Sequence, residues 1–462
     1  MSGAVVGGGA GPSAIYYNPA SISEITESKF SLHASLFSFD FLNIENALGN
    51  GEDLDFTRGS IEPRFISYMV KPKNHENWRL EFAFLNNEKF RMDLTQSVDR
   101  NIDVLTNLPG DERYYSFFQY QNIYRDDWFG FGGSIKLNRS LSIGASMFLS
   151  VKSLEYYYNS DIEAFPSDSV FIDGEYIPFY SANYQKEEYL RFNDYRLLWK
   201  FGVLWKKDRF SLGFNITTPS LGGIYSDGKE VMHKEKQSNI TFPGTGELLP
   251  DYVFSDYSKK NDVSVNAKSP MSIALGFTWF TADETKKIIA TIEYFEGVDS
   301  YKMVEAKENP WIATGSDYGG GDFNDWLTFT DEYKPVLNAA IGYRWNVKKD
   351  LEVLTGFRTD FNYRKKQDPS LNSLNKQIRG LDIDVYHFTG GLSWRVLGQD
   401  IMTGLQYTLG RERNQKQFVN LSDMVEYNTK EMMPLQGTRQ NNMNAFYNSI
   451  SIYFGATFNF GS

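Results

Sequence analysis

Hydrophobic and polar positions alternate along most of this chain, and the clearest case lies at its end. From Ala445 to Phe460, apart from Ala445 and Asn448, the even-numbered positions are apolar, whereas the odd-numbered ones are polar, tyrosine or glycine. A period of two predicts a β-strand with one apolar and one polar face. Soluble strands most often have about five or six residues, and a tilted strand crosses a bilayer with roughly nine to eleven. The chain is therefore expected to end in a membrane strand.

The same alternation recurs in six pairs of segments joined by short polar turns. Membrane barrels join antiparallel strands by short turns on one side and long loops on the other. Six hairpins and one strand at each end therefore predict an all-β fold, a 14-stranded antiparallel transmembrane β-barrel. The pairs are 64–70 with 78–92, 129–137 with 141–151, 191–205 with 210–216, 271–279 with 288–294, 337–345 with 351–361, and 386–396 with 401–409; the single strands are 29–41 and 445–460.

The connections between the hairpins are long and polar, and we expect them to be extracellular loops. Tyr114 to Tyr124 is aromatic enough to form a fifteenth strand. An odd count would place the two ends of the barrel on opposite sides of the membrane, so we assign this stretch to a long loop, as a short helix at most. The expected loops are 42–63, 93–127, 159–188, 219–268, 297–334, 364–382 and 413–444.

Composition separates this chain from other membrane proteins. It contains 36 Phe, 29 Tyr, 9 Trp and 38 Gly, with a mean hydropathy of −0.44. No run of about eighteen apolar residues occurs, which excludes a helical membrane protein, whereas a barrel needs apolar side chains only at alternate positions. Tryptophans that precede short turns predict an interfacial aromatic girdle: Trp205, Trp279, Trp345 and Trp394.

Charge and residue usage exclude further classes of protein and site. The net charge of −11 argues against a nucleic-acid partner. The absence of cysteine rules out disulfides and thiolate metal sites, and we expect no cofactor. The start at Met1 has neither a basic nor a long apolar segment, so we expect the mature form of a chain whose precursor carried a signal peptide.

Residues 1–28 do not follow the strand pattern. They are glycine-rich from Gly7 to Gly11 and continue through Ser13-Ala-Ile-Tyr-Tyr-Asn-Pro-Ala20. A barrel of fourteen strands leaves an open lumen unless something fills it. Glycines allow close passage along a barrel wall, and Pro19 keeps Asn18 extended. These residues are therefore predicted to form a compact plug.

This start, the strand count and the aromatic last strand together resemble the FadL (OmpP1/TodX) family of outer-membrane transport proteins. The resemblance implies an N-terminal hatch at 1–28, a barrel at 29–462, and gating by the family's Asn-Pro-Ala motif, here Asn18, Pro19 and Ala20. It also implies an outer-membrane location with periplasmic termini, lipid and lipopolysaccharide as neighbours, and passive uptake of hydrophobic compounds such as long-chain fatty acids.

An enzyme is not expected. His387 and Ser393 share the polar face of one strand, but six residues of strand separate them by about 20 Å. No Gly-x-Ser-x-Gly motif occurs. Oxygen ligands for Ca²⁺ could come from one loop, although its spacing is not that of an EF-hand and a solvated acidic loop is the favoured interpretation: Asp317, Asp322, Asn324 and Asp325.

The polar strand faces carry charges of both signs, which a barrel would turn toward its lumen. We expect these side chains to pair with one another and assign none of them to a substrate: Lys136, Lys152, Asp194, Arg196, Lys200, Arg344, Arg358, Asp360, His387 and Arg395.

Three functions remain open at this point. The first is passive transport of a hydrophobic small molecule past the hatch. The second follows from a tyrosine- and asparagine-rich composition similar to that of Bacteroidota members of the family: a non-transporting subunit of a larger outer-membrane secretion or assembly complex, with partners bound to the extracellular loops. The third, a general pore, is disfavoured by the plug.

Overall fold

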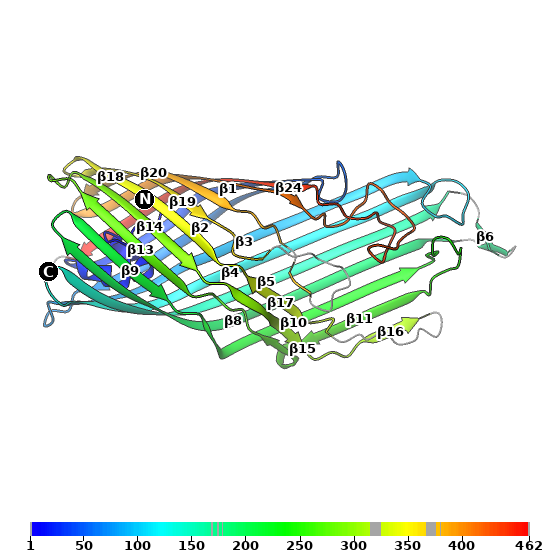
Figure 1. Cartoon of the computed structure of the whole chain (residues 1–462), viewed down its shortest axis with the longest axis horizontal. Coiled ribbons are helices and arrows are strands. Elements are labelled where there is room, and N and C mark those ends of the chain that lie inside the picture. Colours follow the sequence, from blue (N-terminus) through cyan, green and yellow to red (C-terminus); the bar gives the residue numbers. More distant parts are fainter. Residues whose placement is uncertain are drawn as a thin grey trace.

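The computed structural model describes residues 2–167, 170–172, 175–177, 179–314, 325–365, 376–378 and 380–460. It contains the predicted closed, antiparallel 14-stranded barrel, in which the first strand pairs with both the second and the last (Figure 1). In order around the barrel the strands are β1 (Ser28–Glu45), β2 (Leu54–Val70), β3 (Trp78–Ile102), β4 (Glu112–Lys136), β5 (Leu141–Pro166), β8 (Ala182–Lys207), β9 (Phe210–Thr217), β13 (Ser272–Phe280), β14 (Lys286–Phe295), β18 (Val336–Lys348), β19 (Leu351–Asp360), β20 (Val385–Val396), β21 (Gln399–Gln415) and β24 (Met443–Phe460).

The remaining elements belong to the N-terminal segment and to the loop end of the barrel. None of the described helices is long and apolar enough to cross a membrane. These elements are η1 (Gly11–Ser13), α1 (Ala14–Tyr17), η2 (Pro19–Glu24), β6 (Val170–Ile172), β7 (Glu175–Ile177), β10 (Leu221–Ser238), β11 (Tyr252–Lys259), η3 (Lys260–Asp262), β12 (Val263–Val265), β15 (Val298–Ala306), β16 (Trp311–Thr314), β17 (Phe329–Tyr333), β22 (Tyr427–Asn428) and β23 (Met433–Pro434).

A belt of apolar side chains covers the outside of the barrel near the short turns. Phe129 and Phe131 on β4 are 51% and 44% exposed, and Phe201 on β8 is 50% exposed. Lys200, the neighbour of Phe201, points inward and is buried. This arrangement, apolar side chains outward and polar ones inward, is the phase that a transmembrane barrel requires.

Placing a charge in this belt should impair assembly. Phe201→Arg is expected to cost about 2–4 kcal/mol, because a guanidinium near the bilayer midplane loses its hydration. Gln185→Arg lies on the same outward face of β8, outside the belt, and should be nearly neutral. The measurement is the fraction of protein that shows heat-modifiable migration after folding into liposomes; equal fractions for the two variants would contradict the placement of the belt.

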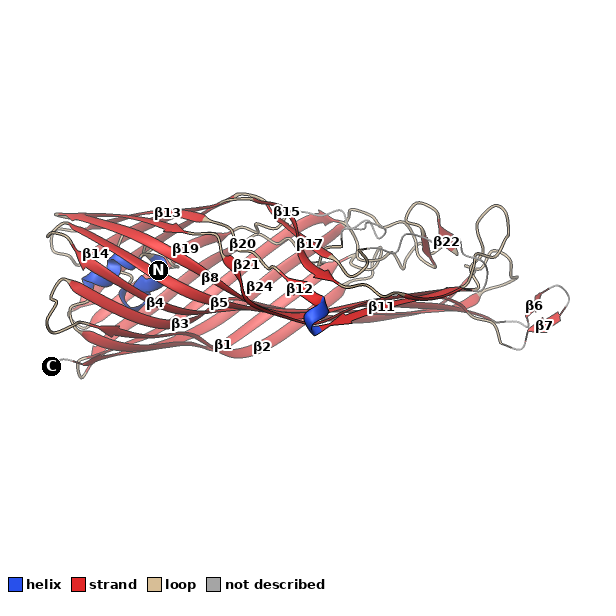
Figure 2. Cartoon of the chain, turned by 90° about the horizontal axis from the view of Figure 1, so that it is seen from below, coloured by secondary structure: helices blue, strands red, loops and turns tan. Residues whose placement is uncertain are grey.

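Four neighbouring strands continue far beyond the belt and form a one-sided wall (Figure 2). β3, β4, β5 and β8 each have 25 or 26 residues. The expectation that Tyr114 to Tyr124 lies in a loop or short helix is therefore wrong, because this stretch continues β4. It adds no fifteenth strand, so the parity argument holds.

The apolar face of each wall strand changes sides where the belt ends, which explains this error. On β8 the belt residues Val203 and Trp205 point outward, whereas farther along the strand Phe192, Leu190 and Tyr184 point inward and are buried. Above the belt the outside faces water and the inside faces packed loops, so the alternation reverses its phase. A prediction that assumes one unbroken alternation along a strand therefore ends that strand where the alternation reverses, which is too early.

Most connections at the loop end are accordingly shorter than predicted, or contain strands of their own, whereas the β19–β20 connection, 361–384, is longer than the predicted 364–382. The expected loops 42–63 and 93–127 shrink to residues 46–53 and 103–111. The expected loop 219–268 instead contains β10, β11, η3 and β12, and the expected loop 297–334 contains β15, β16 and β17. β10 pairs with the upper part of β8, and β11 and β16 extend the wall from there.

Candidate functional site

The N-terminal segment, residues 2–27 (the hatch), lies inside the barrel at the end where the short turns and both chain termini are found (Figure 2). Its buried side chains include Ala14, Ile15 and Ile22. They belong to one apolar cluster with the inward-facing Phe148 and Leu198 of the wall strands. The segment therefore fits the plug that the glycine-rich pattern predicts, and it packs against the barrel as a core.

Asn18 is the polar anchor of the hatch. Its side chain is fully buried, and its amide nitrogen donates to the carbonyl of Val6 (2.8 Å) and to that of Val203 on β8 (3.1 Å). Its amide oxygen accepts from the Ala20 backbone N–H (3.1 Å), which caps η2, while Pro19 occupies the first position of that helix. The motif thus joins two hatch segments to a barrel strand. Gating by these residues remains a prediction.

Glycines on the inner faces of four consecutive strands form the surface on which the hatch rests, and we call them the glycine seat. A Cβ atom added at any of the four would lie closer than 3.0 Å to hatch backbone or to Asn18. Sequence reasoning missed this set, although lumen-facing glycines near the short turns of successive strands were a readable signal. The four are Gly144 (β5), Gly202 (β8), Gly213 (β9) and Gly276 (β13), and register pairs Gly144 with Gly202 and Gly213 with Gly276.

Charged side chains of the barrel and of the hatch itself hold the hatch in place around Gly8, Gly9 and Ile25. Glu24 accepts from the backbone N–H of Gly9 (2.6 Å) and forms an ion pair with Lys206. Lys287 on β14 donates to the Gly8 carbonyl (3.2 Å), and Arg79 on β3 donates to that of Ile25 (2.6 Å). These bonds provide partners for backbone groups of the hatch that lie outside its short helices.

Above the hatch lies a cavity of about 850 Å³ in the lumen. Tyr16 and Tyr17 of the hatch line its floor, and Tyr363 and Leu381 of the β19–β20 connection line it from the loop end. Aromatic and aliphatic side chains share its wall with charged ones: Phe56, Phe65, Phe90, Leu354 and Met402, and Arg58, Arg64, Lys89, Arg358, Asp360 and His387.

The barrel wall is interrupted beside this cavity. Backbone pairing between β2 and β3 covers only Phe65–Val70 with Leu85–Leu80, whereas both strands continue to pair with β1 and β4 on their other sides. Bulges occur on each strand next to the last pair, at Arg64 and at Asn87, and bulges bend strands away from a regular ladder. We call this break in the backbone pairing the gap.

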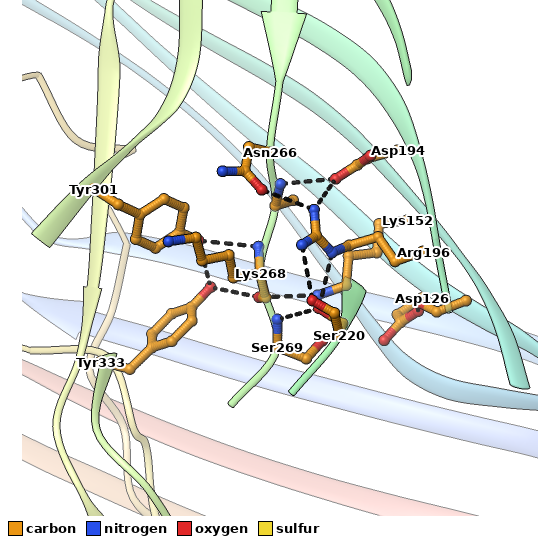
Figure 3. A network of polar contacts seen from close by, with 12 residues as sticks. Asp126, Lys152, Asp194, Arg196, Ser220, Asn266, Lys268, Ser269, Tyr301 and Tyr333 are labelled. Atoms are coloured by element: carbon orange, nitrogen blue, oxygen red, sulfur yellow. Dashed lines mark hydrogen bonds and ion pairs between the residues drawn. The ribbon is translucent and has the colours of Figure 1, made fainter. Parts of the chain in front are cut away.

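A buried polar network holds the wall where β9 ends and β10 begins (Figure 3). Arg196 on β8 pairs with Asp194 (3.0 Å) and donates to the hydroxyl and carbonyl oxygens of Ser220 (2.8 and 3.0 Å). Lys152 on β5 donates to the Lys268 carbonyl (3.2 Å). As predicted for lumen charges, Arg196 and Asp194 pair with each other, and the network serves to position strands.

A second buried network lies under the loops at the wall. Lys376 lies 2.7 Å from His233 Nδ1 on β10 and donates to the Trp326 carbonyl (2.5 Å). Glu188 and Glu235 approach the two His233 ring nitrogens at 3.6 and 3.5 Å. Lys376 thereby fixes the segment that precedes β17 against the wall.

Acid should loosen this attachment. Burial, and then Lys376, lower the pKa of His233, so the unfolded state binds more protons as the pH falls below the usual histidine value, and stability falls with it. Burial also lowers the pKa of Lys376 to about 7. The stability that depends on this lysine therefore changes only above pH 7, where it falls as the pH is lowered toward 7. Burial raises the pKa of Glu235, but the hydrogen bond from His233 and the charge of Lys186 outweigh it and lower that pKa to about 2. Protonation of Glu235 therefore reduces stability only in stronger acid.

Hydrogen exchange of residues 325–333, corrected for the intrinsic rate, should therefore accelerate between pH 7 and pH 5. His233→Gln should flatten this dependence, because an amide does not titrate. The control His75→Gln changes an exposed histidine in the β2–β3 turn and should keep the dependence. An unchanged pH response in His233→Gln would show that other groups control the attachment.

The remaining sequence candidates stay apart from one another or outside the described residues. His387 contacts Thr408 (2.7 Å) and faces Asp360 (3.5 Å), while Ser393 lies six residues farther along β20. Of the calcium candidates, Asp317, Asp322 and Asn324 lie outside the described residues. Asp325 lies 3.5 Å from Lys302 and accepts from Thr328.

Comparison with known proteins decides the fold. No protein-family model and no curated sequence matches this chain. Among solved structures, a FadL homologue from Pseudomonas aeruginosa matches at 13% identity and a TM-score of 0.58, over 97% of this chain and 94% of the other. The toluene transporter TodX of Pseudomonas putida matches at 15% identity and a TM-score of 0.54, over 97% and 94%.

This chain has the FadL/TodX fold. Each match covers nearly the whole of both chains. The residues that hold the hatch here are Asn18 and the glycine seat, on β5, β8, β9 and β13, whereas the lumen cavity is lined by other hatch residues, among them Tyr16 and Tyr17, and by other strands.

Proposed function

We propose that this protein is an outer-membrane channel for the passive uptake of hydrophobic compounds, with long-chain fatty acids as one candidate class. In this proposal residues 1–28 form the hatch, the termini are periplasmic, and the wall and loops are extracellular. The observation that carries the proposal is a lumen cavity of about 850 Å³ that is bounded below by the hatch and lies beside the gap in β2–β3 pairing.

The cavity wall suits an elongated apolar molecule. Burying apolar surface stabilises a ligand by roughly 25 cal/mol per Å², and rings such as Phe56, Phe65 and Phe90 offer such surface. A few polar groups then fix orientation. The gap offers a path between cavity and bilayer that avoids the hatch, and release past the hatch would require the Asn18 bonds to break.

Uptake experiments distinguish a channel from a barrel that transports nothing. Cells that express the protein should accumulate radiolabelled oleate or toluene faster than cells that lack it, and deletion of residues 2–27 should change the rate. Total folded protein, measured by heat-modifiable migration, serves as the control. Equal accumulation with and without the gene for every hydrophobic compound offered would reject the channel.

A second function, membership of a larger outer-membrane assembly, is favoured by one observation at the far end of the wall. The hairpin of β6 and β7 projects there and exposes Phe171 (62%) and Tyr176 (57%), with Phe179 (77%) just beyond. Large apolar side chains that are exposed together outside the membrane mark a site of interaction with another protein. Purification in mild detergent followed by mass spectrometry should then detect a partner that Phe171→Ser/Tyr176→Ser loses; a lone barrel in both samples would reject the assembly.

A further inference from the structure

We infer that the gap between β2 and β3 contains a binding site for the phosphate groups of an outer-leaflet lipid. The inference uses the orientation given under the proposed function, with the gap at the outer side of the membrane, but it does not require transport. It rests on the side chains that border the gap, on the apolar surface outside it, and on the local charge.

Three cations from the two strands meet at one carboxylate. Glu62 on β2 lies 2.5 Å from Lys89 of β3, 3.1 Å from Arg58 and 3.6 Å from Arg64. Lys89 reaches Glu62 across the gap, since the last backbone pair of the two strands is Phe65 with Leu85. A carboxylate has two oxygens, so three cations leave donors for another anion.

The neighbouring acids do not remove this excess. Asp40 stands opposite Arg58 in the β1–β2 register and accepts from Tyr447 (2.9 Å), which brings the local count to three cations and two carboxylates. The Nε atom of Arg64 is buried and has no hydrogen-bond partner among the described residues. The chain as a whole has a net charge of −11, so this local excess of positive charge differs from the rest of the protein.

The outer surface beside the gap is apolar, whereas Arg58, Arg64 and Lys89 line the lumen side, so a lipid headgroup would reach them through the gap. Phe39 and Phe41 on β1 are 46% and 43% exposed, and Ile61 on β2 is 69% exposed. Acyl chains that pack on these side chains would bring their headgroup to the level where β2 and β3 separate. Arginine binds phosphate oxygens with two parallel N–H donors, and lysine adds a point charge.

The site therefore has the features of a lipid headgroup site: partly buried cations, an unpaired guanidinium nitrogen, and an apolar flank for the chains. Bound phosphate would compete with Glu62 for Lys89, so the lipid would both fill the gap and weaken the ion pair that crosses it. Nearby Arg91 does not add to the excess, because it is paired with Asp93 (2.6 Å).

Native mass spectrometry of the full chain, titrated with diphosphoryl lipid A, tests this assignment. The parent protein should retain lipid A, and Arg64→Gln and Lys89→Gln should each weaken its binding roughly tenfold, which is about 1.4 kcal/mol. Glu62→Gln should strengthen it, because the competing carboxylate is removed. The matched control is Arg191→Gln, which removes an exposed arginine from the outer face of β8.

Folding of each variant is checked by heat-modifiable migration, and only folded protein is compared. Loss of affinity confined to the gap variants supports the site. Equal losses in Arg191→Gln, or none in Arg64→Gln and Lys89→Gln, would overturn it. Equal binding of lipid A without phosphates, or displacement of lipid A by laurate but not by inorganic phosphate, would also overturn it. Uptake is measured separately, so a protein that binds lipid A without transporting would reject the channel and keep this site.

Discussion

Replacing Gly213 with alanine is expected to displace the N-terminal part of the hatch from the barrel. The new Cβ would overlap the carbonyl of Val6, whose oxygen also accepts from Asn18. Overpacking of this kind costs about 1–3 kcal/mol, and the hatch is short enough for that to alter its attachment. Gly276→Ala, directly opposite in register, meets Gly7 and should have the same effect.

Hydrogen exchange of residues 3–10 in the purified protein measures this displacement, and single-channel conductance reports whether the lumen opens. The matched control is Gly390→Ala on β20, where an added Cβ has no neighbour within 4 Å. Protection of residues 3–10 that is the same in Gly213→Ala and Gly390→Ala would mean that the glycine seat does not hold the hatch.

Substitution of Asn18 should have the second large effect. Asn18→Ala removes the bonds to Val6, Val203 and Ala20 and leaves buried backbone groups without partners. Each buried group left unpaired costs about 1–3 kcal/mol, so the hatch should lose its fixed position over residues 14–25. Asn18→Asp keeps an acceptor for Ala20 but turns a carboxylate oxygen toward two carbonyls, and it should be at least as damaging.

Two further asparagine variants serve as comparisons for the hydrogen-exchange protection of the hatch. Asn215→Ala removes one hatch bond, to the carbonyl of Tyr17 (2.6 Å), and should give a smaller loss of protection. Asn448→Ala changes an exposed residue of β24 whose hydrogen bond is to Tyr407 and should leave the hatch unchanged. An Asn18→Ala protein as well protected as Asn448→Ala would leave Asn18 without an anchoring role.

The strands in the membrane were predictable because the bilayer acts on each one separately. Every strand there must present apolar side chains to lipid, so a period of two appears in each segment without knowledge of its neighbours. Ala445 to Phe460 is the clearest example, and it became part of β24. Parity then limited the number of strands, because an even count returns the chain to its starting side.

The wall was not predictable in the same way. Above the belt the two faces of β4 and β8 exchange environments, and which face is buried depends on loops distant in sequence. Tyr114 of β4, for example, donates to the carbonyl of Leu435. No local pattern contains that partner, so Tyr114 to Tyr124 could not be recognised as a strand from its own residues.

The candidate site likewise has features that the sequence predicted and features that only the fold shows. The sequence by itself predicted a compact glycine-rich plug before the barrel, because glycine and proline constrain the backbone locally, and the family resemblance pointed to Asn18, Pro19 and Ala20 within it. Only the tertiary structure decided which strand Asn18 binds, that four glycines form its seat, and that β2 and β3 separate beside Glu62 and Lys89. Most of those features are contacts between segments far apart in the chain, such as Asn18 and Val203, which are 185 positions apart, and only the folding of the whole barrel brings them together.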